Sequence, residues 1–316
     1  MDNFDIRNYQ SADPDDLPAL ARLLAETPEI ATSGEDISEA MLRAQYEWPG
    51  HEPTRDRWVA LSPDEPGALV GYACVFKSTP TPRADLLLVV HPAWRRRGLG
   101  SELLRRALDH ARALGATDAS CYAEETDPAA AAFAAAHGFT PAPGYTRLIA
   151  PSDTSFPAPT LPDGYTIRAC RGEPDQALFI ESANTCFAGL WGHNVVTPDI
   201  AHDWLVGLDP SGVCFLFGPD GALVGRGMAQ RIQRDGQPTG YLDAPGVVPA
   251  LRGAGLYVPL LLWGAAWLAR HPDGPVARYL LESWGDDPAT IAAYQSLGFT
   301  LDRRETACRL PLQGAR

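Results

Sequence analysis

The sequence predicts a mixed α/β fold that occurs twice in tandem. Three observations support this: a length of 316 residues at 45% hydrophobic content, a proline-rich stretch near the middle, and a motif that recurs in both halves. One hydrophobic core rarely serves a chain of this length, so two domains are expected. Proline disfavours helix and central strand, so residues 151–162 are interpreted as a linker between domains at residues 1–150 and 163–316.

The two halves share one motif at one spacing. In the first, VHPAWRRRGLG at residues 90–100 is followed by Gly138-Phe139-Thr140. In the second, VPALRGAGLY at residues 248–257 is followed by Gly298-Phe299-Thr300. Both contain Pro-x-x-Arg-x-x-Gly-Leu, and such self-similarity is typical of an internal repeat. Two copies of one domain explain it.

The elements of the first half follow from residue periodicity. Apolar residues at helical spacing predict helices over residues 15–25 and 36–46, the second opened by the capping-box pair Asp36 and Glu39. Apolar or alternating runs between turn residues predict strands. The expected strands are residues 58–61, 68–76, 85–90 and 120–123, with helices at 98–114 and 128–136.

The second half repeats this order. Its expected strands are residues 214–217, 222–229, 241–248 and 279–283, with helices at 256–269 and 288–297 and a further helix through Asn184 and Cys186. In each half, consecutive strands come first, and strands that alternate with helices follow. This order predicts a mixed, mostly antiparallel sheet in each half with helices on both faces.

Charge and cysteine content limit the classes of function. A net charge of -13 opposes binding to nucleic acid or anionic lipid, and it either attracts a cationic small molecule or serves solubility alone. The six cysteines occur singly, as expected of core residues in a reducing compartment, and no metal site is expected. Without a signal peptide or an apolar run of about 18 residues, we expect a cytoplasmic protein with no membrane partner.

The turn after Val90 has the composition of an anion site. Between this strand end and the helix expected to open at Gly98, residues 90–100 contain three arginines and two glycines. Free amide N–H groups at a helix start, with the positive end of the helix dipole, favour a pyrophosphate, and glycines permit close approach. The alternative is a turn with solvated arginines that binds nothing.

At these residues the sequence resembles the GNAT acetyltransferase superfamily. Arg95-Arg96-Arg97-Gly98-Leu99-Gly100 satisfies its acetyl-CoA motif, and helices ending in Gly138-Phe139 and Leu297-Gly298-Phe299 match a second family feature. The resemblance implies two tandem GNAT-like domains, similar in layout to mycothiol synthase. It implies acetyl-CoA as cosubstrate, bound in the first half by Leu88, Val89, Val90, Arg95, Arg96, Arg97, Gly98, Leu99, Gly100, Ser101 and Asp127.

The family reaction is a direct transfer of the acetyl group to an amine. The resemblance implies that the pantetheine arm lies between two splayed parallel strands, here residues 86–90 and 120–123. A backbone N–H polarises the thioester carbonyl, a base or water takes the amine proton, and an acid protonates the departing thiolate.

The two halves depart from the family pattern differently. Tyr257 stands where the second loop should end in Gly or Ala, which puts cofactor binding there in doubt. Aligning the Gly-Phe ends places Ala134 opposite Tyr294, the position of the family's usual thiolate acid. Tyr294 is therefore a candidate acid in the second half or a core aromatic.

The candidate bases are all acidic residues near strand ends. Glu124, with its neighbour Glu125, ends a strand of the first half and is a candidate base there or a solvated surface residue. Asp243 has the same two interpretations in the second half.

Aromatic groups mark the regions that often cover the acceptor in this family. These are Phe187, Trp191 and His193 in the second half, and Trp48 and His51 in the first; interdomain packing is the alternative. The leading hypothesis is an N-acetyltransferase that acts on a small-molecule amine, with acetyl-CoA held by the first half and the second completing the acceptor cavity or a homodimer. The alternatives are catalysis in the second half with structural CoA in the first, or a non-catalytic CoA sensor.

Overall fold

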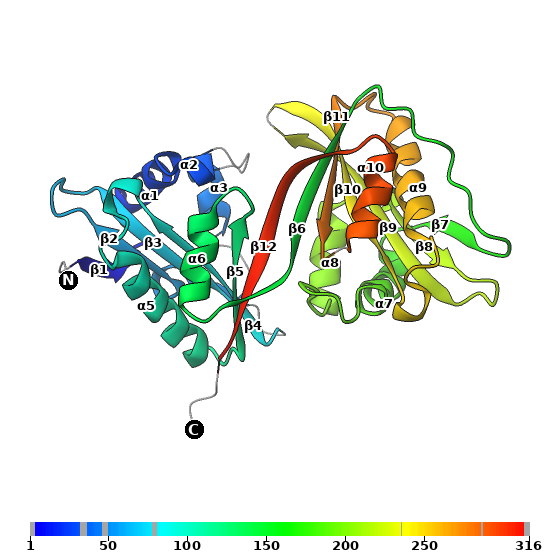
Figure 1. The fold of residues 1–316 in the computed structure, drawn as a ribbon. Coiled ribbons are helices and arrows are strands. Elements are labelled where there is room, and N and C mark those ends of the chain that lie inside the picture. Colours follow the sequence, from blue (N-terminus) through cyan, green and yellow to red (C-terminus); the bar gives the residue numbers. More distant parts are fainter. Residues whose placement is uncertain are drawn as a thin grey trace. The chain divides into compact units, whose positions relative to one another are not determined.

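The computed structural model describes residues 4–31, 37–45, 50–77, 81–234, 236–285 and 287–312. The chain forms two compact units (Figure 1). The first comprises Met1–Pro141 with Ala307–Arg316, and the second comprises Ala142–Thr306. The last strand of the chain therefore contributes to both units, whereas the sequence analysis assigns all of residues 163–316 to one domain.

A mixed sheet forms the centre of the first unit. Strands β1 to β4 pair antiparallel, and β4 pairs parallel with β5. The sheet order is β1-β2-β3-β4-β5-β12. Its strands are β1 (Asp5–Asn8), β2 (Arg57–Leu61), β3 (Leu69–Phe76), β4 (Arg83–Val90), β5 (Asp118–Glu124) and the end of β12 (Thr300–Pro311).

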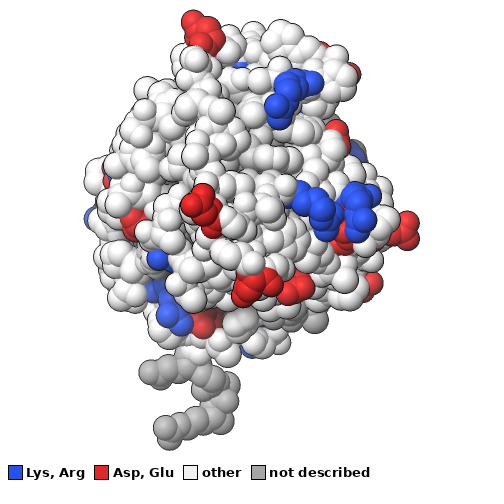
Figure 2. All heavy atoms as spheres, turned by 90° about the vertical axis from the view of Figure 1, so that its right-hand side faces the viewer, with Lys and Arg blue, Asp and Glu red and all other residues white. Residues whose placement is uncertain are grey.

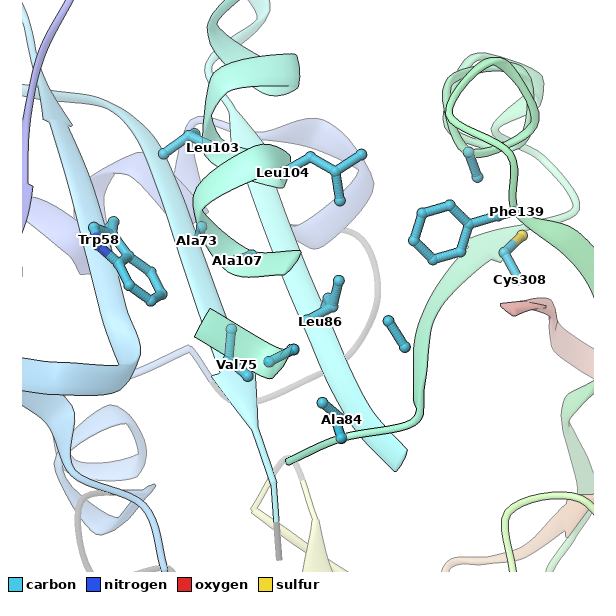
Figure 3. Close-up of a cluster of buried hydrophobic side chains, with 14 of the residues drawn as sticks. Trp58, Ala73, Val75, Ala84, Leu86, Leu103, Leu104, Ala107, Phe139 and Cys308 are labelled. Carbon is cyan, nitrogen blue, oxygen red and sulfur yellow. The ribbon is translucent and has the colours of Figure 1, made fainter. Parts of the chain in front are cut away.

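Helices cover both faces of this sheet. They are α1 (Asp16–Ala25), α2 (Pro28–Ala31), α3 (Glu39–Ala44), α4 (Pro53–Asp56), α5 (Leu99–Ala113) and α6 (Pro128–Ala136). On one face, Leu103, Leu104 and Ala107 of α5 lie over the strands, and Phe139 and Cys308 close the end of the cluster (Figure 3). On the other face, leucines of α1 pack against Val59, Tyr72 and Val89. The two faces of β4 thus belong to different cores.

The second unit repeats this plan. Its sheet order is β12-β6-β11-β10-β9-β8-β7. The strands are β6 (Thr140–Pro151), β7 (Thr166–Ala169), β8 (Val213–Phe217), β9 (Leu223–Arg234), β10 (Gln237–Val247) and β11 (Arg278–Trp284). The helices are α7 (Gln176–Cys186), α8 (Pro198–Gly207), α9 (Tyr257–Ala269) and α10 (Pro288–Ser296). Leu261 and Tyr294 join the core on the α9–α10 face, and α7 and α8 cover the other.

Several elements lie outside the sequence-based expectation. Strands β1, β6, β7 and β12 and helix α8 were not predicted. In β6 the prolines at 141 and 143 precede the stretch from Tyr145 to Pro151 that pairs with β11, so they cost no hydrogen bond of that ladder. Helix α3 is shorter than expected and is capped by Ser38, whose side chain accepts from Met41 N. Asp36 and Tyr46, predicted at its ends, lie outside the described residues.

Candidate functional site

Strands β4 and β5 separate along their length. Their recorded pairing runs from Arg83–Asp118 to Asp85–Ser120. Beyond this point β4 continues to Val90 with its other edge bonded to β3. The predicted cofactor segment 88–90 lies on this separated part of β4, where an extended ligand can use the strand edge for main-chain hydrogen bonds.

The loop after β4 has two residues with left-handed backbone. Arg96 has φ of 64° and Gly98 has φ of 90°. Gly98 is the N-cap of α5 and provides no side-chain cap, so the first-turn amides of Leu99, Gly100 and Ser101 have no side-chain acceptor from the cap. Such amides, with the helix dipole, favour a phosphate oxygen. The loop therefore has the geometry of the predicted anion site.

The predicted cofactor residues differ in what their side chains do. Arg95 donates to both oxygens of Glu29 at 2.8 Å and to Val90 O at 3.1 Å, so it fixes the loop to α2. The exposed Arg97 guanidinium lies 4.6 Å over the Trp94 ring. Leu99 is a core residue, so only its backbone can contact a ligand.

Two further predicted cofactor residues have local partners. Ser101 Oγ lies 3.0 Å from His137 Nε2, and the other ring nitrogen of His137 donates to Phe133 O at 2.8 Å. Asp127 caps α6 by accepting from Ala129 N and Ala130 N at 3.0 and 3.1 Å. Their roles toward the cofactor remain predictions, alongside these structural roles.

The second unit copies the loop backbone. Arg252 donates from Nε to Val247 O at 3.2 Å, as Arg95 does to Val90 O, and its terminal nitrogen donates to Ala188 O at 2.6 Å. Gly253 and Gly255 have φ of 85° and 76°, matching Arg96 and Gly98. Tyr257 begins α9 at the position of Gly100 and packs partly buried against the core beneath α9. The two loops therefore differ mainly in side chains.

The strand before the second loop is irregular. Strands β10 and β11 pair from Thr239–Arg278 to Asp243–Glu282, and the β9–β10 register shifts between Asp243 and Gly246. In the first unit the β3–β4 register is regular from Gly71–Val90 to Phe76–Asp85. β-Bulges are common beside active sites because they redirect backbone and side chains. The two units therefore differ in the strand that precedes the loop.

The two predicted catalytic residues belong to different units. Tyr294 is fully buried in the core that also contains Ala244 and Leu281, near the bulge. Glu124 ends β5 in the first unit and accepts from Thr126 Oγ1 at 3.1 Å. The second unit therefore has a buried tyrosine at the position where the first unit has Ala134.

Glu282 is the acidic residue that the sequence analysis missed. Its carboxylate accepts from Tyr145 OH at 2.7 Å and Tyr241 OH at 3.3 Å, and Arg234 lies 3.5 Å away. Aligning Gly138 with Gly298 places Tyr122 opposite Glu282, so the first unit has no acid at this position. The available signal was a single carboxylate beside Leu280 and Leu281 in a predicted strand.

The aromatic groups expected near the acceptor have distinct environments. Phe187 packs over Gly246 at the bulge, where an added Cβ would lie 2.6 Å from its ring, and it stacks with His193 at 6.3 Å. His51 is buried, and its Nε2 accepts from Arg57 Nε at 2.8 Å. Burial and the charge of Arg57 lower the pKa of His51 to about 4. Trp48 lies outside the described residues.

The surface and thiols carry less information about the site. Figure 2 shows acidic and basic side chains interspersed on the face drawn, with uncharged surface between them. All six cysteines are free, and all except Cys121 are buried. Within the described residues, no helix is both long and apolar enough to cross a membrane.

Comparison with known sequences identifies relatives along most of the chain. The family model "Acetyltransferase (GNAT) family" matches residues 17–139. The mycothiol acetyltransferase of Thermobispora bispora is 35% identical over 241 residues, which is 73% of this chain and 77% of the relative. That of Salinispora tropica is 31% identical over 239 residues, 74% of this chain and 75% of the relative.

Solved structures share the tandem fold. A GCN5-related N-acetyltransferase from Sphaerobacter thermophilus superposes with a TM-score of 0.75 at 22% identity, covering 100% of this chain and 98% of that one. A tandem GNAT protein from the clavulanic acid biosynthesis pathway has a TM-score of 0.69 at 21% identity, covering 99% and 100%. At these identities the similarity concerns the fold alone.

Proposed function

The chain belongs to the acetyltransferase (GNAT) family and is an acetyl-CoA-dependent acetyltransferase. From this premise we propose that it acetylates the amine of a small molecule. We further propose that the first unit holds the acetyl-CoA. The observation that carries the cofactor assignment is the first turn of α5. Its amides have no side-chain cap, and the exposed Arg96 and Arg97 flank them. The net charge of -13 favours a cationic acceptor such as an amine.

The first-unit assignment rests on the difference between Gly100 and Tyr257. At Gly100 an added Cβ would lie 3.4 Å from the Phe133 ring, which is ordinary contact, so a longer side chain at this position starts against that ring. We infer that a phenol beside the first turn hinders the approach of a pyrophosphate, even where its ring packs against the core, as that of Tyr257 does. The same backbone in the second unit carries this phenol naturally.

Exchanging these residues tests the assignment. Gly100→Tyr should abolish tight acetyl-CoA binding measured by isothermal titration calorimetry, whereas Gly115→Ser, at a glycine beyond the end of α5 with open space around it, should retain it. Tyr257→Gly should leave acetyl-CoA binding in the first unit unchanged. A second equivalent of bound acetyl-CoA in this variant would show that the second unit can also bind the cofactor once the phenol is removed. Normal binding by a folded Gly100→Tyr protein would contradict cofactor binding in the first unit.

A second candidate arrangement places catalysis, with its own acetyl-CoA, in the second unit and leaves the CoA of the first unit structural; it requires that Tyr257 leave room for the cofactor. It is supported by the strand bulge, by Glu282 on the α7–α8 face and by Tyr294 near the bulge on the α9–α10 face. In this arrangement Glu282 takes the proton of the acceptor ammonium, and the Tyr294 hydroxyl gives a proton to the departing thiolate. General acid and base groups contribute about 10²- to 10⁴-fold each.

Conservative variants separate the two arrangements. Glu282→Gln and Tyr294→Phe should each lower kcat about 100-fold or more if the second unit catalyses, while Glu124→Gln should have little effect. The reverse pattern assigns catalysis to the first unit. Thermal unfolding should accompany the kinetics, because Tyr294 is fully buried and its hydroxyl also contributes to the core.

A further inference from the structure

An exposed indole lies at the carboxyl end of β11. Trp284 is 42% exposed although it ends a strand of the central sheet. The Tyr145 ring packs against it with centroids 4.7 Å apart and an interplanar angle of 48°. Large aromatic side chains that stay half in water commonly mark binding surfaces, because one face can stack on a ligand while the other is supported.

Tyr145 connects this indole to the Glu282 carboxylate. It pairs with Trp284 across the β6–β11 ladder, and its hydroxyl donates to Glu282 at 2.7 Å. Trp284 and Glu282 are two residues apart on one strand, so their side chains point to the same face of the sheet. The exposed indole and the carboxylate therefore lie on one face of the sheet and are linked through the buried Tyr145.

The backbone of a glycine loop lies against the Trp284 ring. Gly192 lies next to it, and an added Cβ there would lie 3.9 Å from the indole. Gly192 and Gly285 have φ of 86° and 75°, a conformation that favours glycine. The loop therefore approaches the indole with backbone alone, and no side chain of these two residues covers it.

The charges next to the surface argue against a simple polyamine as ligand. Arg234 lies 3.5 Å from the Glu282 carboxylate and offsets much of its attraction for a second cation. The surface instead fits a ligand that has a flat apolar ring with polar groups at its rim. Such a ring can stack on the Trp284 indole while its polar groups reach the Glu282 carboxylate and the Arg234 guanidinium. The ligand then gains stacking from Trp284 and hydrogen bonds from Glu282 and Arg234.

We propose that Trp284 and Tyr145 form the acceptor subsite and that the acceptor carries a ring next to its reactive amine. The proposal rests on the second-unit arrangement described above. Trp284 acts here in binding and specificity, whereas Glu282 acts in proton transfer. The two roles are therefore separable by mutation.

The test compares amines with and without a ring. Acetylation of glucosamine and tyramine is measured against that of cadaverine and spermidine, with free CoA thiol as readout, and binding of each amine is measured by titration in the presence of CoA. The wild type should favour the ring amines. Trp284→Ala should raise their KM and Kd about 3- to 10-fold, the range of one aromatic stacking contact, and Trp284→Phe should recover part of the loss.

The control is Trp204→Ala, because Trp204 is a second exposed tryptophan of this unit at 46% exposure and lies on α8. It should leave KM unchanged. Equal KM and Kd values for Trp284→Ala and the wild type, equal use of linear amines, or no ring amine bound would each overturn the subsite. Full turnover in Glu282→Gln with weakened ring-amine binding in Trp284→Ala would reject second-unit proton transfer while retaining the subsite.

Discussion

Arg226 of β9 is a buried cation whose replacement should stabilise the second unit. It is 3% exposed, and its Nε has no hydrogen-bond partner among the described residues. The guanidinium carbon lies 4.1 Å over the centroid of the Phe179 ring. Burial lowers the pKa of Arg226, although the charge of Asp243 opposes this. The substitution that tests this is Arg226→Met, because methionine replaces the aliphatic stem of arginine with an unbranched apolar side chain and removes the charge.

The expected gain follows from the balance of these contacts. Burying an ion costs several kcal/mol even after relaxation, and a cation–π contact in a dry site returns about 2 kcal/mol. Replacing a whole buried ion pair with apolar groups of similar volume is often neutral or stabilising by about 1–4 kcal/mol, and we apply this range to the single cation Arg226 because its Nε has no hydrogen-bond partner among the described residues. We therefore expect the unfolding free energy to rise by about 1–3 kcal/mol, which raises Tm by about 2–4 °C per kcal/mol for a unit of this size.

Differential scanning calorimetry of the full chain measures this effect. The matched control is Arg168→Met, because Arg168 also lies over a phenylalanine, at 5.7 Å from the Phe215 ring, but donates to Asp175 at 2.7 Å. The control should lower the same transition. A loss of stability in Arg226→Met as large as in the control would refute the reasoning. Higher stability with lower activity would show that Arg226 is retained for function.

Three further predictions concern the first unit and the thiols. Asp56→Asn should lower the free energy of unfolding by about 3 kcal/mol, because this buried carboxylate accepts hydrogen bonds from His110, Arg55 and Glu52 N. Urea unfolding measures the loss, with Glu102→Gln, at a partly exposed carboxylate, as the control. Although burial raises the pKa of Asp56, hydrogen bonds from His110 and Arg55 hold this pKa well below its usual range. The contribution of Asp56 to the stability of the folded state is therefore present above about pH 4 and is lost as the pH falls. Urea titrations at a series of pH values measure this loss. Burial raises the pKa of Cys74, Cys121 and Cys214 to about 12, so thiol reagents at pH 8 should label these cysteines only after denaturation, and rapid labelling of the native protein would contradict this.

The sequence predicted the elements whose signals are local. Helix α5 has an apolar face formed by Leu99, Leu103 and Leu104, and β4 is an apolar run, so each is recognisable from neighbouring residues alone. Strand β12 is different because it is rich in charged residues. Its Asp302 pairs with Arg147 and its Arg309 with Asp118, residues far away in the sequence. A charged strand is stable here because neighbouring strands supply the opposite charges, which no local pattern reveals.

The same distinction applies to the candidate site. The phosphate loop could be predicted because the motif that indicates it consists of adjacent residues, from Arg95 to Gly100. The bond between Arg95 and Glu29 was not, since 66 positions separate the two residues. Glu282 was missed for the related reason that its partners, Tyr145 and Tyr241, come from two other strands. Three-dimensional proximity, and not residue type, distinguishes it from a surface acid.

Comparison of the two loops changes what the shared motif means. Arg95 and Arg252 both donate to the carbonyl that ends the preceding strand, Val90 O and Val247 O, at 3.1 and 3.2 Å. Left-handed residues follow at matching positions in both loops. The arginine and the first glycine of the motif therefore build the turn, and a unit can keep them for folding after cofactor binding is lost. The residue at the end of the motif, Gly100 in the first unit and Tyr257 in the second, is the better indicator of cofactor binding. It borders the first-turn amides but is not needed for the turn.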